Sequence, residues 1–113
     1  MIDQASLRIL NAMLEKTKRL IEIYEKYGKD KILKEYVLSD SIQFEFEKLY
    51  EDSTRLSPEF RVNHPELHVS DLRSIRNRVA HEYESVSLNV LLDTIENDIP
   101  VLAHVLQFLI ENK

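Results

Sequence analysis

The sequence predicts an all-α fold, an up-and-down bundle of four or five helices, and three observations support that prediction. Only one glycine and three prolines occur among 113 residues, so the chain has few points at which it can turn sharply. Apolar residues recur at steps of three and four along most of the chain, which is the spacing of an amphipathic helix. No segment keeps the two-residue alternation of a half-buried strand. We therefore expect residues 1–113 to form a single helical domain.

The first half of the chain predicts two long helices with a short one between them. In the first, the residues at helical spacing are Leu7, Leu10, Leu14, Thr17, Ile21 and Tyr24. Gly28 stands where that pattern stops, so we expect it to cap the helix in a left-handed conformation. A short helix over residues 31–36 then leads into the second long helix, whose apolar positions are Leu38, Ile42, Phe46, Leu49 and Leu56.

The second long helix is expected to end before residues 57–69, which form the longest connection in the chain. Two of the three prolines fall in this stretch, so we expect a turn or two of its own and no long helix. Ser70 follows, and a serine at this point is a good N-cap for a helix over residues 71–84.

The last helix is expected to start after Ser87. Its apolar face consists of Leu88, Leu91, Leu92, Ile95, Ile99, Leu102, Leu106 and Leu109. Pro100 lies inside this run, and the face continues in phase beyond it. We therefore predict a kink near Asn97 and not a break in the helix.

Composition excludes several classes of function. The chain has no cysteine, so a disulfide framework, a thiolate zinc site and a cysteine nucleophile are all excluded. One glycine cannot build a glycine-rich phosphate loop. The apolar runs are far shorter than a membrane span, and the first residues do not resemble a signal peptide. We expect a soluble, cytoplasmic protein that needs no cofactor and does not contact a membrane.

The stretch RNRVAHEY, residues 76–83, gathers cations in a chain whose formal net charge is -5. On a helix, Leu72, Ile75 and Val79 form one apolar stripe, while the polar and small residues Arg73, Arg76, Asn77, Ala80 and His81 occupy another sector. Residues 71–81 carry a formal charge of +2, against -7 for the remainder. Such a small positive site suits one or two phosphates better than a long duplex.

Arginine and histidine together permit phosphodiester cleavage. The planar guanidinium of Arg76 can grip phosphate oxygens and stabilise growing charge, and a histidine such as His81 titrates near neutral pH. With RNA as the substrate, the 2′-hydroxyl serves as the nucleophile, so no metal is required. One histidine is not easily both base and acid. A two-fold homodimer would bring two copies of the site together and supply both groups.

Simpler interpretations stand beside this one. Arginines and a histidine on an exposed helix are most often only a solvated surface. His64 and His68 are four residues apart, but Pro65 between them favours a loop surface over a metal site. His104 is expected to be exposed. The acidic residues Glu45, Glu47, Glu51 and Asp52 are expected to form a solvated face or to meet a basic partner, and Tyr24, Tyr27, Tyr36 and Tyr50 to lie in the core or at its edge.

The spacing within residues 76–83, an arginine, four residues, a histidine, one residue and a tyrosine, resembles the signature of HEPN domains of the HepT-like toxin family. Flanking stretches extend the resemblance: Asn-His-Pro-Glu at 63–66, Leu-Asp-Thr-Ile at 92–95 and Asn-Asp-Ile-Pro at 97–100. Residues 56–106 are similar in motif, and the first half of the chain is similar only in its helix pattern.

The resemblance implies a metal-independent endoribonuclease toxin that dimerises and is paired with a minimal nucleotidyltransferase antitoxin. By position, it makes Arg76 and His81 the catalytic residues and Asn77 a polar support. Arg73 lies outside the signature, but it shares the polar sector of the helix and is expected to be a further phosphate contact. It makes Tyr83 the residue to which the antitoxin transfers AMP. Tyr83 follows Arg76 by almost two helical turns, so an AMP phosphate there would be within reach of Arg76.

A second function class uses the same patch without catalysis. In that alternative the chain is a helical module that binds a nucleotide or a nucleotidyltransferase, and the arginines only hold phosphate. Both functions predict affinity for phosphate, but only the enzyme requires a titrating His81.

Overall fold

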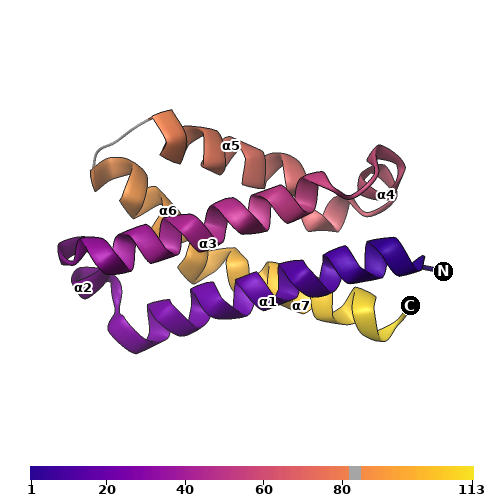
Figure 1. The fold of residues 1–113 in the computed structure, drawn as a ribbon, viewed down its shortest axis with the longest axis horizontal. Coiled ribbons are helices and arrows are strands. Elements are labelled where there is room, and N and C mark those ends of the chain that lie inside the picture. Colours follow the sequence, from indigo (N-terminus) through magenta and orange to yellow (C-terminus); the bar gives the residue numbers. More distant parts are fainter. Residues whose placement is uncertain (82–84) are drawn as a thin grey trace.

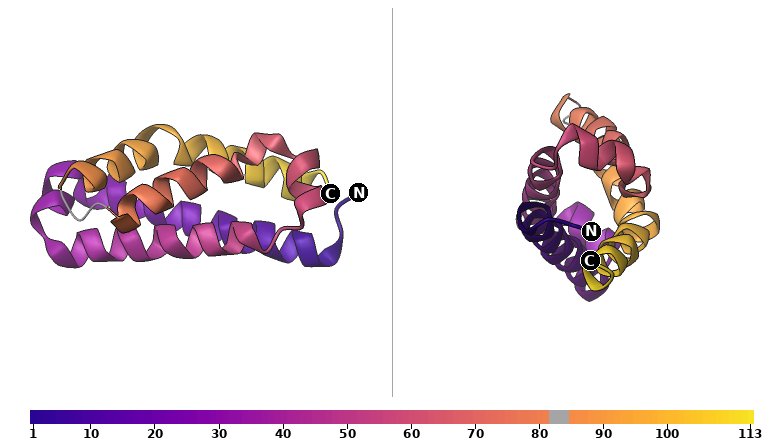
Figure 2. Two further views of the ribbon diagram at one scale, coloured as in Figure 1. Left: turned by 90° about the horizontal axis from the view of Figure 1, so that it is seen from above. Right: turned by 90° about the vertical axis from the view of Figure 1, so that its right-hand side faces the viewer.

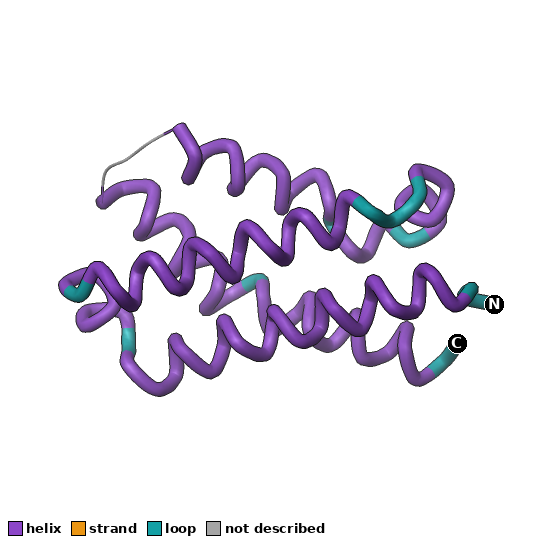
Figure 3. Tube along the Cα trace, in the orientation of Figure 1, coloured by secondary structure: helices purple, strands orange, loops and turns teal. Residues whose placement is uncertain are grey.

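In a computed structural model, the described residues 1–81 and 85–113 are almost entirely helical (Figure 3). Of residues 80, 81 and 85–87 only the backbone is described. These residues form seven α-helices and one 3-10 turn: α1 (Gln4–Tyr27), α2 (Lys29–Lys34), α3 (Tyr36–Thr54), α4 (Pro58–Asn63), η1 (Pro65–Leu67), α5 (Val69–His81), α6 (Ser85–Asn97) and α7 (Ile99–Glu111). The all-α prediction is confirmed.

The long elements alternate in direction along a molecule of 44 × 27 × 19 Å. Helix α1 runs from the end that carries both termini, α3 returns beside it, and α5 runs away again before α6 and α7 lead back (Figures 1 and 2). Helix α1 packs against α3 and α7, and α5 packs against α3 and α6. This is the predicted up-and-down topology, with the short helices α2 and α4 at its corners.

The described residues contain more helices than predicted because α4 forms within the predicted connection and the last element is divided into α6 and α7. Helix α6 ends at Asn97 and α7 begins at Ile99, so the prediction of a kink without a break is wrong. The interruption is a single residue. The Asp98 N–H donates to the Thr94 carbonyl at 2.8 Å, and the Leu102 N–H donates to the Asp98 carbonyl at 3.0 Å. Pro100 lies in the first turn of α7, where its missing N–H costs little.

The core is built from the apolar faces of the long helices. Its fully buried members include Leu10, Met13, Leu20, Ile42, Phe46, Leu49, Leu91, Leu92, Ile95 and Leu106. The face of α1 differs from the predicted one: Met13 and Leu20 are completely buried, whereas Leu7 and Ile21 are only partly so. Since α1 packs between α3 and α7, its buried face is wider than a single seam.

Two predicted helix starts are wrong. Helix α5 begins at Val69, so Ser70 lies within its first turn, where the Ser70 carbonyl accepts a hydrogen bond from Ser74 Oγ at 3.1 Å. The His68 carbonyl accepts from the N–H groups of Asp71 and Leu72 and thereby starts the helix. Likewise, Ser87 lies inside α6, which begins at Ser85.

Gly28 caps α1 at the predicted position, but the predicted left-handed conformation is wrong. Its N–H donates to the Tyr24 carbonyl at 2.9 Å, and its own carbonyl accepts from the Ile32 N–H at 3.1 Å. The backbone has φ 80° and ψ 160°, so φ is positive but ψ is extended and not left-handed helical. None of the helices in residues 1–81 and 85–113 combines the length and apolar character that a membrane span requires.

Candidate active site

Helix α5 presents the two predicted faces. Leu72 is buried, and Ile75 and Val79 are partly buried against the core, which confirms the apolar stripe. On the other side, Arg73 and Asn77 are exposed, and Arg76 is half-buried between α5 and α3. The surroundings of the Arg76 side chain are therefore formed largely by residues of the neighbouring helix α3.

Arg76 is held by a carboxylate and an aromatic ring of α3. Its Nε lies 3.1 and 3.2 Å from the two carboxylate oxygens of Glu47, and its guanidinium lies 5.4 Å from the centre of the Tyr50 ring. Within α5, its Nη1 donates to Oδ1 of Asn77 at 3.2 Å. The other terminal nitrogen, Nη2, has no hydrogen-bond partner in the part of the chain that the structure describes.

These contacts fix both the charge and the orientation of the guanidinium. The hydrogen bond to Glu47, together with the attraction of its charge, raises the pKa of Arg76 above its already high usual value. Arg76 is therefore cationic at neutral pH. Glu47 also cancels one formal positive charge, so the site is less basic than residues 71–81 alone predicted.

For two predicted site residues, His81 and Tyr83, the structure describes no side chain. His81 is the last residue of α5, and its backbone stands about 7.5 Å along the helix axis from that of Arg76. Its side chain is among those not described, and so is that of Ala80. Tyr83 lies outside the described residues altogether.

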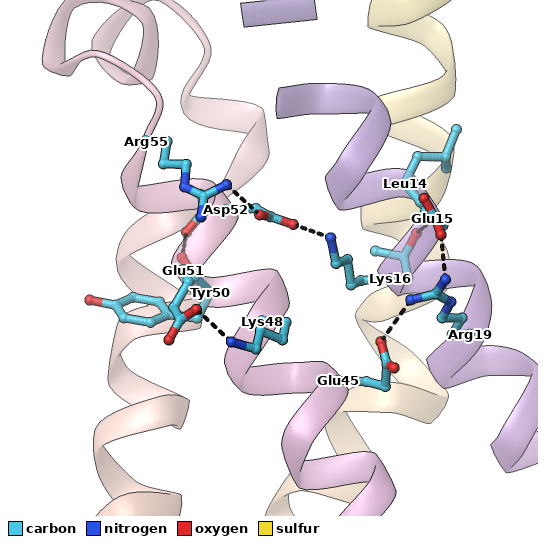
Figure 4. Close-up of polar contacts among 12 residues, drawn as sticks. Leu14, Glu15, Lys16, Arg19, Glu45, Lys48, Tyr50, Glu51, Asp52 and Arg55 are labelled. Carbon is cyan, nitrogen blue, oxygen red and sulfur yellow. Dashed lines mark hydrogen bonds and ion pairs between the residues drawn. The ribbon is translucent and has the colours of Figure 1, made fainter. Parts of the chain in front are cut away.

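The prediction of a solvated acidic face on α3 holds only in part. Glu47 and Glu51 remain partly exposed, whereas Asp52 and Glu45 are largely buried and pair with basic side chains of the same chain (Figure 4). Asp52 is buried and lies between Lys16 Nζ, 2.8 Å from Oδ2, and Arg55 Nη1, 3.4 Å from Oδ1. Glu45 Oε2 lies 3.7 Å from Arg19 Nη1 on α1. The pairs with Lys16 and Arg19 join α3 to α1, whereas Glu47 joins α3 to α5.

The predicted positions of the other aromatic and histidine residues are mostly confirmed. Tyr24, Tyr27 and Tyr50 lie at the edge of the core. Tyr36 is 76% exposed, so the prediction for this residue is wrong: it is the first residue of α3 and faces outward. His104 is exposed, as expected.

His64 and His68 flank the 3-10 turn and each lies near a single carboxylate. The Nδ1 atoms of these histidines lie 3.4 Å from Glu66 and Asp71, respectively. In the described part of the chain, no three histidine or carboxylate side chains are grouped in a way that would hold a metal ion.

Sequence reasoning missed Glu47 and Tyr50 as neighbours of Arg76. Their spacing of three places them on one face of α3. However, 29 positions separate Glu47 from Arg76, and only the packing of α3 on α5 brings them together. The excess of acid over base in residues 45–52 was the available signal, because buried or half-buried carboxylates require cationic partners.

Comparison with known proteins agrees with the resemblance in sequence. Residues 13–109 match the family model described as "Ribonuclease HepT-like". A curated relative, "Probable ribonuclease HepT" of Thermococcus cleftensis, is 27% identical over 93 residues, which cover 79% of this chain and 84% of the relative. No solved structure matches the chain. Since the family model covers most of its length, the chain belongs to the HepT-like ribonuclease family of HEPN proteins.

Proposed function

We propose that the protein is a metal-independent endoribonuclease in which Arg76 binds the scissile phosphate and His81 transfers protons. The observation that supports this most is the arrangement of Arg76. Glu47, Asn77 and Tyr50 hold three parts of the guanidinium, while Nη2 is unpaired within the described residues. A guanidinium fixed in this way is prepared to bind phosphate oxygens without reorganising.

The reaction begins when a neutral His81 imidazole removes the proton from the ribose 2′-hydroxyl. The 2′-oxygen attacks the adjacent phosphorus, and Arg76 stabilises the charge that develops on the non-bridging oxygens. The bond to the 5′-oxygen then breaks, and that oxygen takes a proton from a general acid. The products are a 2′,3′-cyclic phosphate and a 5′-hydroxyl, and no metal takes part.

Asn77 and Arg73 have supporting roles in this proposal. Asn77 accepts a hydrogen bond from Arg76 and so orients the guanidinium. Arg73 is exposed one turn earlier on α5, on the same side of the helix as Arg76, where it can contact a neighbouring phosphate.

The second proton-transfer group is proposed to come from a second copy of the chain. In a two-fold homodimer, the segments 76–83 of both copies face one cleft, so that one His81 acts as base and the other as acid. Sedimentation at micromolar concentration is expected to give a dimer. A strict monomer that still cleaves RNA would contradict the composite site.

The direct test uses single substitutions and a chelator. Arg76→Ala and His81→Ala are expected to abolish RNA cleavage, while Arg8→Ala on the exposed surface of α1 leaves it unchanged. EDTA is expected to have no effect on the wild-type rate. Cleavage that survives both substitutions, or that is lost with EDTA, would contradict the proposal.

We further propose that the protein is a toxin whose partner is a minimal nucleotidyltransferase antitoxin, which transfers AMP to Tyr83. The added phosphate and nucleoside would occupy the site that RNA needs. Co-expression with the cognate transferase is expected to give an inactive protein heavier by one or more AMP units. Tyr83→Phe is expected to escape modification, whereas the exposed Tyr36→Phe serves as the matched control and remains modified. An adduct on another residue would contradict this regulation.

One observation favours the non-catalytic alternative, a module that only binds a nucleotide or a nucleotidyltransferase. Glu47 already neutralises Arg76, which weakens the attraction of Arg76 for a phosphodiester. This alternative predicts that RNA or nucleotide binds without being cleaved, and that His81→Ala changes neither binding nor toxicity.

A further inference from the structure

A cavity of about 510 Å³ lies beside the proposed active site, at the end of the bundle where α3, α4, η1 and the start of α5 meet. The side chains that line it include Tyr50 and Thr54 of α3, Arg61 of α4, His64, His68 and Arg73. Cavities of roughly 300 to 1,000 Å³ are the usual size for small-molecule sites, so this one has room for a nucleotide.

The cavity is lined by two arginines that have no acidic partner. Within the described residues, neither the Arg61 side chain nor the Arg73 side chain forms a hydrogen bond or an ion pair, and the Nε of Arg61 is buried with its hydrogen unsatisfied. Asp71 is the carboxylate in the lining, and it lies 3.4 Å from Nδ1 of His68. A buried N–H without an acceptor is unfavourable, and a shift of the Arg61 side chain toward the cavity would let a bound anion supply one.

This lack of ion pairs contrasts with the cations that pack against α3. Lys16, Arg19 and Arg76 each have a carboxylate of α3 within 4 Å. Arg8, Lys18 and Lys34 also lack an ion pair within the described residues, but none of them lines this cavity. Two unpaired arginines that line the same cavity are suited to bind an external anion.

The remaining lining offers aromatic surfaces. The His64 ring packs against the Phe60 ring with centroids 4.3 Å apart and an angle of 32° between the planes, so Phe60 supports the His64 ring at the edge of the cavity. Tyr50 contributes a second ring. Bases of single-stranded RNA stack on rings of this kind, and arginines bind the phosphates between them.

The cavity adjoins the Arg76 site through one shared side chain. Tyr50 lines the cavity and also carries the guanidinium of Arg76 over its ring at 5.4 Å. Arg73 and Arg76 are three residues apart on α5 and thus neighbours on its surface. A strand whose scissile phosphate lies on Arg76 therefore has its neighbouring nucleotide at the mouth of the cavity.

We propose that this cavity is a subsite for the nucleotide next to the scissile phosphate, with Arg61 and Arg73 on its phosphate and His64 and Tyr50 against its base. The inference rests on the proposed ribonuclease function and deepens it, since it assigns single-stranded RNA as the substrate class. The sequence pattern did not single out Arg61. In this proposal it is a substrate-binding residue on α4, whereas the residues of the sequence signature lie on α5, here called the signature helix.

Binding can be measured independently of cleavage. The probe is a short fluorescent oligoribonucleotide whose 2′-hydroxyls are methylated, so that it cannot be cleaved, and the readout is anisotropy at fixed salt. Arg61→Ala/Arg73→Ala is expected to weaken binding by about tenfold, as expected for the loss of charge-assisted phosphate contacts. Arg8→Ala, which removes the same charge from α1, is expected to bind within about twofold of wild type. Arg61→Lys is expected to retain most of the affinity, and helicity measurements confirm that each variant is folded.

Cleavage kinetics provide the second readout. In the double variant KM is expected to rise about tenfold while kcat changes by less than about threefold, because the cavity binds substrate equally in the ground and transition states. If the double variant binds the oligonucleotide as wild type does, the subsite is refuted, whatever the cleavage assay shows. If wild type does not cleave RNA but the double variant still loses tenfold in binding, the ribonuclease proposal fails and the binding site stands.

Free AMP distinguishes an RNA strand from a free nucleotide as the source of the bound group. AMP is expected to compete with the oligonucleotide only at concentrations far above the oligonucleotide Kd, because it lacks the contact with Arg76. If AMP binds as tightly as the oligonucleotide, the cavity is a free-nucleotide site and the assignment to RNA is overturned.

Discussion

The guanidinium of Arg76 on α5 lies against the carboxylate of Glu47 on α3, with Nε 3.1 and 3.2 Å from the two oxygens. The pair connects the signature helix to a helix that begins 40 residues earlier in the chain than Arg76. It orients the arginine and also places a negative charge next to the position proposed for the substrate phosphate. Glu47 is thus expected to have two opposing effects on RNA binding, and a charge-neutral substitution separates them.

Glu47→Gln is expected to strengthen RNA binding, because the amide oxygen still accepts a hydrogen bond from Arg76 while the negative charge is gone. We expect roughly a threefold lower Kd at low salt and a smaller gain at high salt, since the pair is partly exposed. Anisotropy with the methylated oligoribonucleotide measures the change. Glu15→Gln, which removes an exposed charge on α1, is the control. Weaker binding by Glu47→Gln would mean that orientation of Arg76 outweighs repulsion.

Removing Asp52 is expected to destabilise the protein more than removing its partner Lys16. Asp52 is 7% exposed and contacts both Lys16 and Arg55, whereas the Lys16 side chain is 19% exposed and has Asp52 as its ion-pair partner. Asp52→Ala is expected to lower the free energy of unfolding by about 3 kcal/mol, because the buried end of Lys16 loses its partner. Lys16→Met is expected to cost only about 1 kcal/mol, since Arg55 still pairs with Asp52. Urea unfolding followed by circular dichroism gives both values, and equal losses would refute this account of the pair.

Substitution of Gly28 by alanine is expected to lower the stability of the protein, although the added methyl group would clash with nothing. A Cβ at this position would meet nothing within 4 Å, but φ 80° with ψ 160° is a conformation essentially restricted to glycine. Gly28→Ala is therefore expected to lower the free energy of unfolding by about 2 kcal/mol. The exposed Glu25→Ala on α1 is expected to change it by less than about 0.5 kcal/mol. Thermal unfolding of the two variants is the measurement, and a neutral Gly28→Ala would show that the turn relaxes.

The fold class could be predicted from the sequence because helical spacing is local information. Leu10, Leu14 and Thr17 repeat at steps of four and three, and the structure buries all three. The ends of the helices were harder to predict from the sequence. Ser70 has the side chain of an N-cap, yet the turn formed by Pro65 to Leu67 closes at His68 and starts α5 two residues before the predicted first residue, Asp71.

The site was predictable only along one helix. The sequence shows that Arg76 and Asn77 share a polar sector, and the structure places them there with a hydrogen bond between them. Contacts between helices were not predictable, because charge alone does not reveal which partner a carboxylate will meet. Glu47 and Asp52 look alike in the sequence, but one pairs with Arg76 of α5 and the other with Lys16 of α1. The roles proposed for His81 and Tyr83 remain predictions.

The chemistry at the scissile bond tests the central proposal most directly. The measurement compares an RNA that the protein cleaves with the same RNA carrying a single 2′-deoxy sugar at the cleaved position, both in EDTA, with analysis of the product ends. We predict that the all-ribose RNA gives a 2′,3′-cyclic phosphate and a 5′-hydroxyl, and that the deoxy-substituted position is not cleaved. Cleavage of the deoxy-substituted position at the same rate, or loss of all cleavage in EDTA, would contradict a mechanism in which Arg76 and His81 act on RNA without a metal.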